Sequence, residues 1–411
     1  MTNSIFEKIT NYQKTVVRTY LTYQCLSCLF FTSAVWLYFY RLFITDAQVG
    51  ILDGLAFGIG LIAEVPSGVL ADKFGRGRIA RLGLILTGCG FIIQGLGSSI
   101  APFFIGNSIT MIGVSLTSGA DEALFFAKIN FDRNSAQWRK LVTRGSQMRL
   151  LGILTATLIG GWLHTINPRL PWILTGIAFL GSALLIWRVN DRDFVKEKLS
   201  VGKELKNHFR DIKDGFAQFC SHKFFRYVPL ILTVQALFYA TSWGLLRMVL
   251  LDRFHFDPMA GSVVVALCTL STVAALSFIH HHAEKISEKL VLSSIAICAA
   301  ASLLASIADI GAWGSGVILM LFSGESILRP FLSEIFNNLA REEQRATVLS
   351  IASFFRVLPY VVLAPIIGAL NTNGKLDYFL LVFPALIGGA LLFYLSQKKR
   401  DALIKSDVLI R

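Results

Sequence analysis

Charged residues are scarce in this chain. Only 16% of its 411 residues are Asp, Glu, Lys or Arg, whereas soluble domains carry about 25%. Hydrophobic residues make up 54%, and the mean hydropathy is +0.60. A chain with so few charges lacks the polar surface of a soluble globular protein, so the composition predicts an integral membrane protein.

Residue sets typical of enzymes are also missing. We find no Ser/His/Asp set, no phosphate-binding glycine loop and no metal-ligand cluster. Cys25 and Cys28 have CxxC spacing but no second pair or histidine ligands nearby, which favours ordinary buried thiols. Neighbouring histidines 280–282 point in different directions on a helix. The sequence predicts no enzyme, no cofactor and no metal; a membrane-embedded enzyme or receptor is the alternative from another class.

Long apolar runs recur from one end of the chain to the other. Each is long enough to cross a bilayer as a helix, which takes about 20 residues. The runs do not alternate between polar and apolar residues, which excludes the strands of a membrane barrel. We therefore expect an all-α protein with twelve spans, at 19–40, 48–71, 79–98, 101–126, 146–165, 171–189, 226–250, 259–281, 290–308, 312–337, 346–370 and 377–396.

Lysine and arginine concentrate in alternate connections between these spans. They follow the second, fourth and sixth spans, whereas the intervening connections hold at most one each. Basic loops stay in the cytoplasm, so both termini are predicted there, in a plasma membrane of the bacterial inner-membrane type. The net charge of +13 then indicates contact with anionic lipid headgroups, and without a soluble basic domain nucleic acid is not expected as a partner.

One long polar connection, residues 190–225, separates the first six spans from the last six. Its apolar residues recur at helical spacing, which predicts an amphipathic helix on the membrane surface. The expected domains are therefore a bundle at 1–189, a cytoplasmic linker at 190–225 and a second bundle at 226–411.

The two predicted bundles share short sequence patterns. The fourth span carries SGADEALFF from Ser118, and the tenth carries SGESILRPF from Ser323. In the next span of each bundle an arginine and a glycine stand twelve positions apart, Arg149 with Gly161 and Arg356 with Gly368. Parallel repeats of six helices occur in transporters, with the substrate site near the membrane midplane between them.

A motif lies between the second and third spans. It reads Gly68-x-x-x-Asp72-Lys73-x-Gly75-Arg76, followed by Gly77 and Arg78. With the twelve spans and the repeat, this motif resembles the signature of the major facilitator superfamily, except that a second basic residue is usual at position 77. The resemblance implies two pseudo-symmetric bundles that rock to give alternating access, a small-molecule substrate usually coupled to protons, and a monomer.

The motif also implies a gating contact on the cytoplasmic side. A carboxylate at position 72 is attracted to the N-terminal end of a helix, here the eleventh span. Gly68 lacks a side chain and would let another backbone approach. By resemblance, Arg76 pairs with an acid of the fourth span, either Asp121 or Glu122.

Ionisable residues inside spans are costly and are functional candidates by default. For the acids of the fourth span we expect a structural pairing with Arg76 or Arg149. For Glu325 two interpretations stay open: an ion pair with Arg329 one helical turn away, or a carboxylate that carries a proton. The coupling candidates are Glu64, Asp121, Glu122, Arg149, Glu325, Arg329 and Arg356.

Two further expectations concern charges in the spans. We predict that Glu64 pairs with Arg356 when the cytoplasmic gate is shut, since the second and eleventh spans meet there in the family. Arg247 and Asp53, near the outer ends of their spans, are expected to reach the membrane interface.

The substrate is less clearly indicated. In the family, the first, fourth, seventh and tenth spans line the cavity, and here they are rich in aromatic residues. An aromatic lining with few charges favours amphipathic or cationic organic molecules, although an interfacial belt of aromatics is the alternative. The candidates are Trp36, Tyr38, Tyr239, Trp243 and Phe322.

The direction of transport is predicted from the fifth span. Proton-coupled exporters of the family carry G-P-x-x-G-G there, and residues 156–161 read A-T-L-I-G-G. The final glycines are present, and export by proton antiport is expected from the overall resemblance to the family. Proton-coupled uptake of a nutrient or metabolite is the second interpretation, because the Gly-Pro pair is missing.

Overall fold

The structure, a computed structural model, describes residues 11–129, 136–189, 222–282, 287–340 and 345–409. These residues form helices joined by turns, with no strand among them. Ten helices within these ranges are long and apolar enough to cross a membrane, or eleven if one bent pair is a single span. Twelve spans were predicted, and this count does not confirm that number. The first predicted span, 19–40, is not a continuous helix.

Contacts divide the chain into two units. Unit 1 consists of the described residues within 1–44, 55–207 and 258–266, and unit 2 of those within 45–54, 208–257 and 267–411. Most of the predicted linker, with its amphipathic helix, lies outside the described residues. The predicted domain boundaries stay a prediction.

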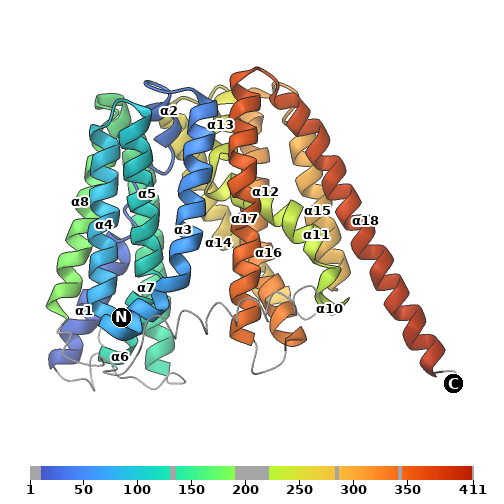
Figure 1. The fold of residues 1–411 in the computed structure, drawn as a ribbon, viewed down its shortest axis with the longest axis horizontal. Coiled ribbons are helices and arrows are strands. Elements are labelled where there is room, and N and C mark those ends of the chain that lie inside the picture. Colours follow the sequence, from blue (N-terminus) through green and yellow to red (C-terminus); the bar gives the residue numbers. More distant parts are fainter. Residues whose placement is uncertain (1–10, 130–135, 190–221, 283–286, 341–344, 410–411) are drawn as a thin grey trace. The chain divides into compact units, whose positions relative to one another are not determined.

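The described residues of the first half of the chain form the helices labelled α1 to α8 (Figure 1). They are α1 (Asn11–Leu26), α2 (Trp36–Tyr40), α3 (Asp46–Phe74), α4 (Arg76–Leu96), α5 (Ile100–Thr117), α6 (Ala120–Ile129), α7 (Ala136–Ile166) and α8 (Leu170–Arg188).

The second half begins with short elements and continues with long helices (Figure 1). They are α10 (His222–Phe225), α11 (Val228–Leu230), the π-helix η2 (Ile231–Gln235), α12 (Ala236–Ser242), α13 (Leu245–Arg253), α14 (Pro258–His282), α15 (Glu288–Ala305), the 3-10 helix η4 (Gly311–Trp313), α16 (Gly314–Leu339), α17 (Arg345–Thr372) and α18 (Leu376–Leu409).

Glycines bring the helices of unit 1 close together. Helix α4 lies between α5 and α8. A Cβ added at Gly90 would lie 2.5 Å from the carbonyl oxygen of Gly106, and one at Gly113 would lie 2.5 Å from that of Gly83. Lipid tails give helices no hydrophobic reason to associate, so close backbone packing through small residues supplies much of the attraction.

The first predicted span is not one continuous helix. Helix α1 ends at Leu26 and α2 begins at Trp36, with turns and irregular backbone between them. In this segment the backbone N–H of Phe31 donates to Thr175 Oγ1 at 3.0 Å, and the hydroxyls of Ser33 and Thr157 lie 2.9 Å apart. The prediction of a helix over 19–40 is wrong: the Thr175 hydroxyl of α8 takes the place of a helical acceptor for Phe31, and the Thr157 hydroxyl of α7 contacts the Ser33 side chain.

The seventh predicted span is broken as well. Helices α12 and α13 meet at Trp243 and Gly244 with a bend of 66°. The Leu245 backbone N–H donates to Tyr360 Oη of α17 at 2.7 Å. A Cβ at position 244 would collide with the ring of Tyr360, so a glycine is required beside this tyrosine.

The first residues of α3 belong to unit 2 and pack on α17. Cβ atoms added at Gly50 and Gly54 would collide with backbone atoms of α17. Asn371 Nδ2 donates to Asp46 Oδ2 at 2.5 Å, and the Tyr360 hydroxyl donates to Asp53. Polar contacts and close glycine packing therefore hold this end of α3 to α17.

The glycine contact between α4 and α5 can be tested directly. Gly90→Ala should lower the Tm of the purified chain, because its methyl group would press on the Gly106 carbonyl; overpacking of this kind costs about 1–3 kcal/mol. Gly388→Ala in α18 is the control, since an added Cβ there meets no atom within 4 Å. Equal Tm values for the two variants would show that the close contact does not stabilise unit 1.

Candidate functional site

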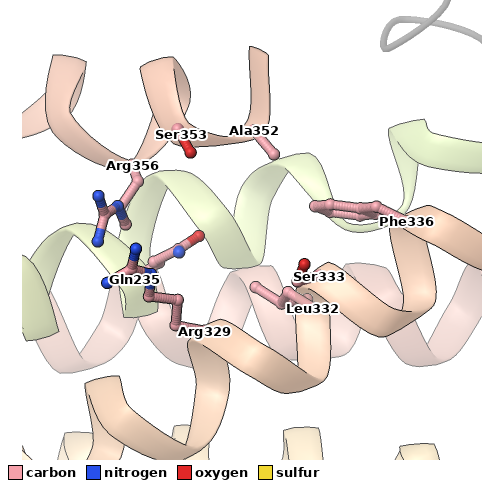
Figure 2. A pocket seen from close by; sticks show the side chains of 8 residues that line it. All are labelled: Gln235, Arg329, Leu332, Ser333, Phe336, Ala352, Ser353 and Arg356. Carbon is pink, nitrogen blue, oxygen red and sulfur yellow. The ribbon is translucent and has the colours of Figure 1, made fainter. Parts of the chain in front are cut away.

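Charged and polar side chains of unit 2 surround a cavity of about 140 Å³. The cavity lies between η2, α16 and α17 (Figure 2). It is lined by Gln235, Arg329, Leu332, Ser333, Phe336, Ala352, Ser353 and Arg356. Two of the coupling candidates named from the sequence, Arg329 and Arg356, therefore line the same cavity.

A buried ion pair stands beside this cavity. Arg356 Nη1 and Glu325 Oε1 are 3.3 Å apart, and the two side chains are only 15% and 7% exposed. The guanidinium of Arg356 also lies over the ring of Tyr239, 5.4 Å from its centroid. An ion pair of Glu325 with Arg329 was one of the two interpretations left open, and in this structure the carboxylate pairs instead with Arg356 of α17.

Arg329 is placed differently from Arg356. It is exposed and lines the cavity, and its guanidinium has no hydrogen bond or ion pair with the residues that the structure describes. The group thus holds two arginines and one carboxylate, which gives the cavity an excess of positive charge.

The π-helix positions another polar group at this site. Element η2 covers Ile231–Gln235 and ends at Gln235, which is buried and lines the cavity. A π segment inserts one residue into the helical repeat and turns the following side chains, and such segments are frequent at functional sites. The sequence gives no pattern that predicts it.

The cavity has a polar end and an apolar end. In Figure 2 the side chains of Arg329, Gln235 and Arg356 gather at one end, and the ring of Phe336 lies toward the other. A cavity with convergent polar groups at one end and apolar side chains at the other suits a small amphipathic molecule.

A related cluster occurs in unit 1. Arg149 Nη2 of α7 is 3.4 Å from Glu122 Oε1 of α6 and 2.9 Å from Gln24 Oε1 of α1. Asp121 Oδ2 accepts from the Tyr23 hydroxyl at 2.7 Å. Arg149 and Glu122 are 46% and 68% exposed, so solvent weakens this pair far more than the pair in unit 2.

The loop motif shows one clear reason for a glycine. Gly75 separates α3 from α4 with φ of 95°, a conformation that favours glycine. Arg76 Nη2 lies 3.4 Å from Asp72 Oδ1, and both side chains are about half exposed. Within unit 1 a Cβ at Gly68 would meet no described atom within 4 Å, and the close approach of another backbone stays a prediction.

The motif's gating role stays a prediction. Lys73 lies over the Phe74 ring at 5.4 Å, and Arg78 is exposed in the first turn of α4. Glu64, exposed on α3, belongs to unit 1 and Arg356 to unit 2, so the pair expected between them also stays a prediction.

None of the five aromatic candidates lines the cavity of Figure 2. Tyr239 contributes indirectly by stacking on Arg356. Trp243 is 59% exposed at the bend of the seventh span, and Phe322 lies under Arg247 at 5.8 Å. Trp36 and Tyr38 are half-buried in unit 1.

Three residues are more important in the structure than the sequence suggested. All three are buried: the exposed fractions of Asp53, Arg247 and Tyr360 are 7%, 5% and 0%. The expectation that the charged groups of Asp53 and Arg247 reach the membrane interface is therefore wrong. Arg247 Nη1 donates to the Ser242 carbonyl at 2.7 Å, next to the break that Tyr360 bridges. The default rule that intramembrane charges are functional would have identified Asp53 and Arg247.

The described residues give little support to a metal site or a disulfide. No group of three or more His, Cys, Asp or Glu within the described ranges could hold a metal. Cys25 and Cys28 are free thiols.

The family follows from sequence comparison. Residues 19–364 match the family description Major Facilitator Superfamily. The chain belongs to this superfamily. It is therefore a multi-pass membrane transporter and not an enzyme.

The chain also resembles individual superfamily members. It is 23% identical over 366 residues to multidrug resistance protein 2 of Bacillus subtilis (strain 168), which covers 84% of this chain and 86% of the relative. Among solved structures, the nucleoside transporter NupG matches with a TM-score of 0.71 at 12% identity, covering 95% of this chain and 100% of that one. Peptide transporter POT in complex with sulfate matches with a TM-score of 0.72 at 13% identity, covering 97% and 96%. These structures share the fold.

The hydrogen bonds at the break of the seventh span predict a specific loss of stability. Tyr360→Phe removes the hydroxyl that donates to Asp53 and accepts from the Leu245 N–H. The buried N–H then has no partner, and such a loss lowers the free energy of unfolding by about 1–3 kcal/mol. Tyr378→Phe, at a tyrosine that is 61% exposed, is the control. Thermal unfolding of both variants should show a lower Tm for Tyr360→Phe alone; an unchanged Tm would mean that the break does not depend on this hydroxyl.

Proposed function

We propose that this transporter is driven by protons and carries small amphipathic organic molecules, with Glu325 as the carboxylate that takes up and releases the proton. The observation that carries the proposal is the buried pair of Glu325 and Arg356 beside an amphipathic cavity. The two six-helix bundles expected from the sequence would alternate access by rocking.

The pair is suited to coupling because the Arg356 guanidinium attracts the ionised form of Glu325 and not the protonated form. When Glu325 takes up a proton, its attraction to Arg356 is lost, and the guanidinium is released toward the cavity. Opening a buried pair without such neutralisation leaves an uncompensated charge and costs about 3–5 kcal/mol. Protonation therefore changes both the charge of the cavity and the position of one of its lining groups.

Export is the direction that the resemblance to a multidrug resistance protein supports. In this mechanism a proton enters as the substrate leaves. The gating motif, with Asp72 and Arg76, would close the cytoplasmic side of a monomer in a bacterial inner membrane, as the resemblance implies.

Proton-driven uptake is the second candidate, and the charge of the cavity favours it. An anion placed between Arg329 and Arg356 repels a charged Glu325 and so favours its protonated form. Proton and substrate would then bind together, which is the requirement for movement in the same direction. For a cationic substrate the same groups favour exchange instead.

Vesicles that contain the purified chain and the pH-sensitive dye pyranine test the function and its direction. A panel of small amphipathic acids, alcohols and amines is added outside, and protein-free vesicles report passive permeation. Exchange for protons raises the internal pH as the substrate enters, whereas cotransport lowers it. No protein-dependent change of internal pH with any compound would contradict proton coupling.

The role of Glu325 predicts a separation of two activities. Glu325→Gln should reduce substrate-driven proton movement at least tenfold, because an amide does not titrate, while substrate exchange between the two sides of the vesicle membrane continues. Glu334→Gln is the matched control, since this exposed acid lies on the same helix away from the cavity. Proton movement that survives Glu325→Gln would exclude Glu325 as the proton carrier.

A further inference from the structure

We propose that the cavity in unit 2 binds an amphipathic organic anion, with its carboxylate or similar group between Arg329 and Arg356 and its apolar part toward Phe336. The inference rests on the proposed function as a carrier of small organic molecules and specifies the chemical class of the substrate. It replaces the cationic substrates that the aromatic residues of the sequence suggested.

The first argument is the charge of the cavity. Two arginines line it, and the carboxylate beside them, Glu325, already contacts Arg356. The described residues that line the cavity include no acid. A cation would enter a site that is already positive, whereas an anion removes the excess charge. At these short distances and with partial burial, the difference favours anions strongly.

The second argument is the arrangement of hydrogen-bond donors. A guanidinium offers its N–H groups in a fork that matches the two oxygens of a carboxylate. The Arg329 guanidinium has no hydrogen-bond or ion-pair partner among the residues that the structure describes. Figure 2 shows it at the same end of the cavity as Arg356, with Gln235 beside them. The amide of Gln235 and the hydroxyl of Ser353 supply further donors.

The third argument is the opposite end of the cavity. Phe336 and Leu332 are buried and line it together with Ala352. These three side chains gain free energy by covering an apolar group and offer no hydrogen bond; the Ser333 hydroxyl beside them is a single neutral group and carries no charge to balance a second one. A small inorganic anion would leave it empty, so an organic anion with an apolar part fits better.

Glu325 then acts as an internal competitor of the substrate. Its carboxylate occupies Arg356 in the absence of a ligand, at 3.3 Å, and a bound anion would take its place. Displacement is easier when Glu325 is protonated. The inference therefore links proton and anion binding positively and strengthens the uptake candidate over export.

Binding to the purified full-length chain tests the inference. The probes are phenylacetate, phenylbutyrate and phenylhexanoate, each with the alcohol and the amine of the same skeleton, and the readout is the ligand-dependent rise in Tm. We expect saturable shifts with at least one carboxylate and none with its alcohol or amine. Larger shifts with the amines, or none with any carboxylate, would overturn the inference.

A variant of Arg329 and a control variant of Lys375 test whether the cavity holds the anion. Arg329→Gln should weaken carboxylate binding about tenfold, the effect of losing one charge-assisted hydrogen bond. Lys375→Gln, which removes an equal charge from an exposed loop, should leave it unchanged. If both variants lose binding equally, the anion is attracted by net charge and not by the cavity.

Glu325→Gln gives a result that loss of structure would not produce. Because the amide does not hold Arg356 as firmly, carboxylate affinity should rise about tenfold at neutral pH and lose its pH dependence. Weaker binding in this variant would contradict the competition.

The binding test and the vesicle test fail separately. Carboxylate binding without proton movement would leave the anion site intact and refute proton coupling. Proton-coupled transport of amines alone would refute the anion site and leave the carrier function intact.

Discussion

Backbone N–H and C=O groups inside a membrane need hydrogen-bond partners, because lipid supplies none. This requirement decides where the chain can interrupt a span. The first span is interrupted where hydroxyls of α7 and α8 surround it, with Phe31 bonded to Thr175. The seventh is interrupted where Tyr360 accepts from the Leu245 N–H. Each interruption lies inside one unit. The first and seventh spans correspond to one another in the two halves of the sequence. Interrupted helices in corresponding positions are typical of transporter binding regions.

An acid–arginine pair occurs in each of the two units. Arg149 and Arg356 hold the same place in the repeat, and each pairs with an acid from the preceding SG motif: Glu122 in unit 1 and Glu325 in unit 2. The pairs differ in burial. Glu122 is mostly exposed, and its pair is weak in solvent. Glu325 is 7% exposed, and a change in its protonation would change the electrostatic potential of the cavity beside it. The acids hold different places in the motif, and of the two pairs only the one in unit 2 is shielded from solvent.

Sequence patterns predicted the helical membrane fold, the superfamily and the charged residues that approach the cavity, because spans, motifs and intramembrane charges follow from local composition. They did not predict the partner of Glu325. Helical spacing favours Arg329, but the partner Arg356 comes from another helix, and such contacts depend on packing. The breaks at residues 27–35 and 243–244 were missed for a similar reason: apolar residues continue through them, and the hydroxyls that replace the helical bonds lie far away in the sequence.

Burial of Glu325 and Arg356 also exposes the transporter to the electric field of an energised membrane. With the carboxylate ionised, the pair is a neutral dipole; once the acid is protonated, a net positive charge remains within the membrane. A full charge moved across a bilayer at 100 mV changes in free energy by about 2.3 kcal/mol. Protonation of Glu325 would therefore add one charge to the positive charge that Arg329 already contributes, and the membrane potential would act more strongly on the protonated carrier than on the ionised one.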